Sequence, residues 1–156
     1  MAFDITKINS AGSDGVKTLL LLNDTTSEYG ITLTASEASA IVENRDKALV
    51  NTGRIEFGTS VTEKIIKVFC SSPYVNRANF ADTVSELTEI FFYYKSEMLE
   101  KLSDDELIKL MKDEFDGRCE GSTELLASKA LYNYVQKLKG FDVDESSDTE
   151  DTDIYG

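Results

Sequence analysis

The 156-residue chain contains no histidine, no tryptophan, one proline and two cysteines. Histidine is the most common general base and a frequent metal ligand, so its absence removes serine–histidine and cysteine–histidine nucleophile pairs and the usual zinc sites. An enzyme built on this chain would have to use carboxylates, lysine or a thiolate with another activator. We therefore predict no catalytic residue, no metal site and no cofactor.

The cysteine usage and the lack of long apolar runs indicate where the protein resides. Cys70 and Cys119 lie far apart in helical or helix-flanking sequence, as expected of reduced thiols in a cytosolic protein. Residues 1–4 carry no basic group, and the longest aliphatic run, residues 19–22, is far shorter than a signal-peptide core or a membrane span. These features predict a cytoplasmic protein that does not enter a membrane.

Charge of one sign dominates the chain, which has 29 acidic and 16 basic residues and a net charge of -13. Seven of the acidic residues and none of the basic ones lie in residues 141–156. Binding to nucleic acid or to an anionic membrane requires a basic stripe, and none is evident, so neither partner is expected. The tail has too few apolar residues to offset the entropy of ordering, which predicts disorder from about residue 143. The expected organisation is a helical domain over residues 1–140 and an acidic tail over 141–156.

The most regular pattern in the chain is an apolar seam with alternating steps of four and three residues: Phe80, Val84, Leu87, Phe91, Tyr94 and Met98. This spacing matches one buried face of an α-helix, predicted from about residue 79 to about residue 101. Further apolar residues lie on its other sides, which is typical of a central helix.

Other helix starts are indicated by a hydroxyl residue followed three positions later by glutamate, the capping-box pattern: Thr34 with Glu37, Ser60 with Glu63, and Ser103 with Glu106. A last helix is expected from about Ser122 to Gly140. Periodicity alone allows residues 16–22 to be a helix or a buried strand; a helix is preferred because no partner strand is evident. Residues 23–33 are then expected to be a loop. The predicted fold is all-α, a single-domain bundle of five or six helices around the long central one.

Several segments resemble a family of small uncharacterised helical proteins of Gram-positive bacteria, a domain of unknown function. The similarity is carried by residues 29–34, 53–58, 69–74, 89–95, 103–107 and 121–124. The resemblance implies a bacterial, cytosolic, helical protein and supplies no activity. The acidic tail is not part of the pattern.

We expect a non-enzymatic helical module that binds a protein partner or associates with itself. Its expected binding surface is formed by charged residues and tyrosines that a helical core does not require: Arg54, Glu56, Tyr74, Tyr93, Lys95 and Glu97. Arg54 and Glu56 lie between two glycines, in a segment that could be a structured turn or a recognition loop.

Two other functions stay open. One is a small metal-dependent enzyme using carboxylates such as Glu97, Asp104, Asp105 and Glu124. The other is an acidic decoy that mimics DNA for a basic partner.

Overall fold

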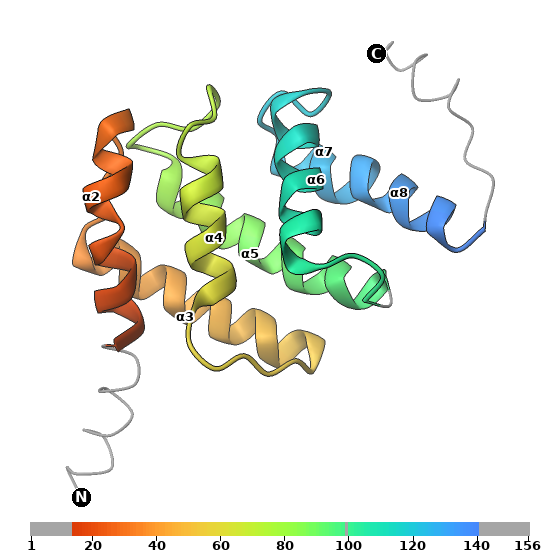
Figure 1. The fold of residues 1–156 in the computed structure, drawn as a ribbon, viewed down its shortest axis with the longest axis horizontal. Coiled ribbons are helices and arrows are strands. Elements are labelled where there is room, and N and C mark those ends of the chain that lie inside the picture. Colours follow the sequence, from red (N-terminus) through yellow and green to blue (C-terminus); the bar gives the residue numbers. More distant parts are fainter. Residues whose placement is uncertain (1–13, 99, 141–156) are drawn as a thin grey trace, which may run out of the picture.

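The predicted apolar seam is buried along its whole length, each of its six side chains being at most 5% exposed. The computed structural model describes residues 14–98 and 100–140, and all of the regular elements in these ranges are helical (Figure 1). The elements form a single-domain helical bundle, as predicted. Helix α5 (Phe80–Glu97) carries the seam and contacts α3 (Ala35–Thr52), α4 (Ser60–Phe69), α6 (Asp104–Asp116), α7 (Thr123–Leu125) and α8 (Leu131–Leu138). The expectation that this helix is the central one is confirmed.

Helix α5 is shorter than predicted, because it ends at Glu97 rather than near residue 101. Beyond it the chain turns, with Glu100 in the left-handed backbone region at φ 63° and the Lys101 amide donating to the Met98 carbonyl. Leu102 and Ser103 then lead into α6. The turn places Glu100 beside α3 and α5, where its carboxylate finds two cationic partners.

The N-terminal part of the described chain is helical and not extended. Residues 14–21 form a helix in which Leu19 is fully buried, which confirms the preference for a helix there. The expected loop over 23–33 is wrong for its first part, since α2 (Asn23–Thr26) and the 3-10 helix η1 (Ser27–Tyr29) follow directly. The Asn23 side chain bonds both the N–H and the C=O of Leu33, and the Thr26 hydroxyl donates to the Ile31 carbonyl. These local bonds make the short turns stable without a long apolar pattern.

Two of the three predicted capping boxes are present. Thr34 and Glu37 cap α3 reciprocally, and Ser103 and Glu106 cap α6 in the same way. The pair Ser60 and Glu63 is wrong, because Ser60 already lies inside α4.

Thr59 precedes the first residue of α4, and its hydroxyl donates to the Glu63 carboxylate at 2.8 Å. The first-turn amide of Val61 is instead bonded by the carboxylate of Glu56, 3.0 Å away. Glu56, from the preceding loop, therefore caps the N-terminus of α4.

The C-terminal helix contains an interruption that the sequence pattern does not reveal. The helix begins after Ser122, whose hydroxyl accepts a hydrogen bond from the Leu125 amide, and it runs through α7 and α8. The interruption between them is the π-helical segment η2 (Leu126–Ala130). The Tyr94 hydroxyl on α5 donates to the Ala127 carbonyl inside η2. Residues 141–156, including the predicted tail, lie outside the described residues. In the part of the chain that is described, no helix combines the length and the apolar character needed to cross a membrane.

Candidate functional site: the loop between α3 and α4

The loop of residues 53–59, here called the α3–α4 loop, is held on its inner side by one arginine. Arg45 on α3 donates twice to the Glu56 carboxylate, at 3.0 and 3.1 Å, and once to the Glu56 carbonyl at 3.0 Å. It also donates to the Gly58 carbonyl and pairs with Asp46. The side chains of Arg45 and Glu56 are only 11% and 13% exposed. A nearly buried ion pair with several hydrogen bonds thus fixes the path of the loop.

The outer side of the same loop is apolar. Phe57 is 93% exposed and Ile55 is 82% exposed. Arg54 and Glu56, which alternate with them, point toward the protein and have bonded partners there. The usual distribution of a surface loop is therefore reversed at these four positions, with the charged side chains inward and the apolar ones in water.

The loop can take this path because a glycine lies near each end. Gly53 and Gly58 have φ of 67° and 83°, in the left-handed region where other residues are strained. Between them, successive side chains point to opposite sides. The loop therefore exposes both Ile55 and Phe57 to solvent.

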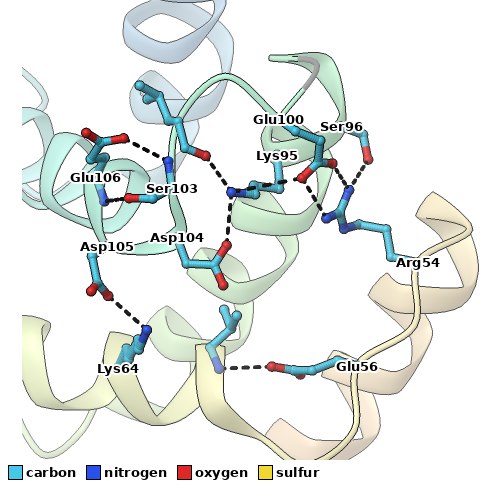
Figure 2. Close-up of polar contacts among 12 residues, drawn as sticks. Arg54, Glu56, Lys64, Lys95, Ser96, Glu100, Ser103, Asp104, Asp105 and Glu106 are labelled. Carbon is cyan, nitrogen blue, oxygen red and sulfur yellow. Dashed lines mark hydrogen bonds and ion pairs between the residues drawn. The ribbon is translucent and has the colours of Figure 1, made fainter.

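Arg54 connects the loop to the end of α5 (Figure 2). Its guanidinium donates to the Ser96 hydroxyl at 3.0 Å and to the Glu100 carboxylate at 2.6 and 3.3 Å. Lys95 lies on the other side of that carboxylate, 4.0 Å away, and pairs with Asp104 at 3.0 Å. The Lys95 ammonium also donates to the Leu102 carbonyl. This ion network ties the α3–α4 loop to the turn between α5 and α6.

The network changes the proton affinity of its exposed members. The hydrogen bond from Arg54, with a smaller contribution from its charge, lowers the pKa of Glu100 below its ordinary value. On the neighbouring side, the hydrogen bond to Asp105 raises the pKa of Lys64. Both shifts favour the charged forms, so Glu100 and Lys64 stay ionised at neutral pH.

The six predicted surface residues are divided among several environments. Arg54 and Lys95 are brought together through Glu100, and Lys95 is buried, with its side chain 9% exposed. Glu56 lies under the α3–α4 loop.

The other three predicted residues lie elsewhere in the bundle. Glu97 pairs with Lys139 after α8 at 3.4 Å, and Tyr93 is half-exposed. Tyr74 packs edge-on against Phe115 of α6.

Sequence reasoning missed Ile55, Phe57 and Arg45. The two glycines indicate a turn or recognition loop, but the pattern points to its charged residues, Arg54 and Glu56, and not to its apolar ones. Arg45, within the helix pattern of α3, gives no signal by itself. A signal for the outward side was nevertheless present, since Ile55 and Phe57 alternate with charged residues in a segment too short to form a core strand.

The residues considered for metal or thiol chemistry do not form a site in the described ranges. Within residues 14–98 and 100–140, no group of three or more carboxylates and cysteines is placed to hold a metal ion. Burial raises the pKa of the Cys119 thiol to about 11 and also raises the pKa of Cys70. Both thiols are buried and free, so neither is activated as a nucleophile.

A groove of about 350 Å³ lies between α3 and α5. Polar and charged groups make up most of its lining, including Asp82, Glu86, Glu89 and Lys47. The Glu86 carboxylate already accepts a hydrogen bond from Thr123. Seven of its eight lining residues are polar or charged, so the groove is not an apolar pocket.

Fold and site together define a small all-helical bundle whose distinctive surface feature is a rigid loop with an apolar outer side. The chain belongs to a family of unknown function (DUF6323), whose model matches residues 18–142. No curated protein and no solved structure gives a match. The family has no known function and adds no activity.

Proposed function

We propose that this protein is a non-enzymatic, cytosolic protein-interaction module and that the α3–α4 loop makes the contact. The observation that carries the proposal is the exposure of Phe57 and Ile55, 93% and 82%, on a loop that Arg45 and Glu56 hold in one path. Aromatic side chains are enriched in protein interfaces, where they contribute much of the binding energy.

Energetics support a binding role for this loop. Burying a phenylalanine or an isoleucine is worth about 1.5–3 kcal/mol each, and in the isolated protein that stabilisation is forgone at positions 55 and 57. The loop is also ordered before any partner arrives, because its backbone carbonyls at Glu56 and Gly58 are bonded to Arg45. A contact loop that is already ordered loses less conformational entropy on binding.

The predicted surface residues take different parts in this proposal. Arg54 and Glu56 support the loop from within, and Lys95 supports it indirectly through Glu100. Tyr93 and Tyr74, 50% and 39% exposed, are members of the predicted set that stay accessible to a partner but have no part in holding the loop.

Site-specific photocrosslinking tests the proposal. A benzophenone amino acid replaces Phe57 in one variant and Leu21, which is 71% exposed on the first helix, in a matched control. We expect position 57 to give a discrete crosslinked protein in the native host and position 21 to give none. Excess unlabelled wild-type protein should compete for the crosslink, whereas Phe57→Ser should not. Equal crosslinking from both positions, or competition by Phe57→Ser, would contradict the proposal.

The alternative of a carboxylate-based metal enzyme has its own measurement. Thermal unfolding is followed while calcium, magnesium, manganese or zinc is added, because a ligand that binds only the native state raises the unfolding midpoint. A saturable rise of the midpoint, lost on substitution of Asp104 or Asp105, would favour that alternative over the interaction module.

A further inference from the structure

We propose that the partner bound by the α3–α4 loop is a second copy of this chain, and that the two copies meet loop to loop about a two-fold axis. This inference rests on the proposed function, since it specifies the partner of the same contact.

Charge decides where two copies can approach. Each chain has a net charge of -13, so most approaches of one copy to another are repulsive. Around the loop, however, positive and negative groups are paired: Arg45 with Asp46 and Glu56, and Arg54 with Glu100. The outward residues Ile55 and Phe57 are uncharged. The loop is therefore a nearly balanced area on a strongly acidic protein, where a copy meets little repulsion.

The same charge balance argues against a basic partner. A protein recruited by electrostatic attraction would approach a surface with unpaired carboxylates. The carboxylates of Glu56 and Glu100 already have arginine partners at 3.0 and 2.6 Å. Attraction of a basic protein would favour other parts of this molecule over the loop.

Shape favours a symmetric contact over a head-to-tail one. Phe57 and Ile55 project into solvent, and the groove between α3 and α5 that a copy could offer them is lined largely by polar and charged groups. In a two-fold contact the same patch faces itself, so that the two Phe57 rings and the two Ile55 side chains cover one another. The contact then needs no apolar pocket on either copy.

The area predicts a weak dimer. Phe57 can bury roughly 150–250 Å², Ile55 adds somewhat less, and Val50 near the end of α3 is also 79% exposed. The sum falls short of the roughly 800 Å² per partner of a standard stable interface. We therefore expect a dissociation constant between about 10 and 1,000 µM, the range of small and transient contacts.

Sedimentation velocity on the full chain tests the inference. Samples from about 5 µM to about 1 mM in 150 mM NaCl should show a weight-average mass rising from 17.3 kDa toward twice that value. Phe57→Ser should remain monomeric throughout, with an unchanged circular dichroism spectrum. Leu21→Ser, which removes an exposed leucine from the first helix, should dimerise like the wild type.

Salt and crosslinking provide two further readouts. Raising NaCl from 50 to 500 mM screens the repulsion between two chains of charge -13 and should tighten the dimer by roughly threefold or more. In purified protein, a benzophenone at position 57 should give a crosslinked band at twice the monomer mass, and one at position 21 should give none.

The outcomes separate this inference from the proposed function. A wild-type protein that stays monomeric at 1 mM, or a dimer that persists in Phe57→Ser, would refute the inference that the partner is a second copy. If position 57 then crosslinks a different protein in the native host, the interaction module stands and the self-contact falls. Phe57-dependent binding to vesicles of phosphatidylcholine, without any protein crosslink, would overturn both.

Discussion

Replacing Arg45 with methionine should release the α3–α4 loop from the body of the protein. Methionine keeps most of the side-chain length and volume but none of the hydrogen bonds to Glu56 and Gly58. The Glu56 carboxylate would retain its bond from the Val61 amide, yet it would lose its counter-charge in a position where it is only 13% exposed.

The expected cost follows from that burial. Breaking a fully buried ion pair costs about 3–5 kcal/mol, because one charge is left without compensation. The pair here lies near the surface and water can reach Glu56 once the loop moves, so we expect a loss of about 2–4 kcal/mol in the free energy of unfolding. Arg77→Met is the matched control, since the Arg77 bridge to Glu37 is more exposed, at 43% and 29%, and should be worth less than about 1 kcal/mol.

Urea unfolding measures the free energies, and amide hydrogen exchange locates the change. Exchange in Arg45→Met should accelerate at residues 54–59, with little change in α5. A loss no larger than that of Arg77→Met, or unchanged exchange in the loop, would show that Arg45 does not hold the loop in place.

Three other predictions follow from buried or close contacts. The Thr62 hydroxyl is buried without a hydrogen-bond partner, whereas the Thr88 hydroxyl donates to the Val84 carbonyl. Urea unfolding should therefore show that Thr62→Val is neutral or stabilising and that Thr88→Val lowers the free energy of unfolding by about 1 kcal/mol. Gly121→Ala should lower the unfolding midpoint, because φ is +82° and the new Cβ would lie 2.4 Å from the Tyr74 Cβ. In a double-mutant cycle, Tyr74→Gly, which removes that Cβ, should reduce the loss more than Tyr74→Ala, which keeps it. The raised pKa of Cys119, about 11 against an ordinary 9.0, means that its stabilising effect is fully present below pH 9 and is lost as the pH rises toward 11, so Cys119→Ala should show a shallower alkaline fall in stability.

The fold was predictable where one physical signal acted alone. The seam of α5 follows from burial at a helical period, and the caps at Thr34 and Ser103 follow from local hydrogen bonding. At Ser60 the same pattern failed because Glu56, from an adjacent loop, supplies the capping carboxylate. The end of α5 was misplaced for a similar reason, since the turn containing Glu100 is stabilised by Arg54 from another segment.

The candidate site was predictable only in its location. The two glycines marked a structured loop, but sequence patterns assume that charged groups face water and apolar groups face the core. Arg45 reverses that order, because it provides inward partners for Glu56 and the loop carbonyls and leaves Ile55 and Phe57 outside. This arrangement depends on the contact between Arg45 and Glu56, which are eleven residues apart in the sequence, and no local pattern encodes it.

The π-helical segment η2 lets the last helix hold one extra residue without turning α8 away from the core. A π segment is equivalent to one extra residue within an α-helix, and one residue corresponds to about 100° of rotation about the helix axis. Converting Leu126–Ala130 to ordinary α-helix without removing a residue would rotate α8 by about 100°, taking Leu131 and Val135 away from their present buried positions. Deleting one residue from the segment would instead let the helix regain ordinary pitch with that packing kept.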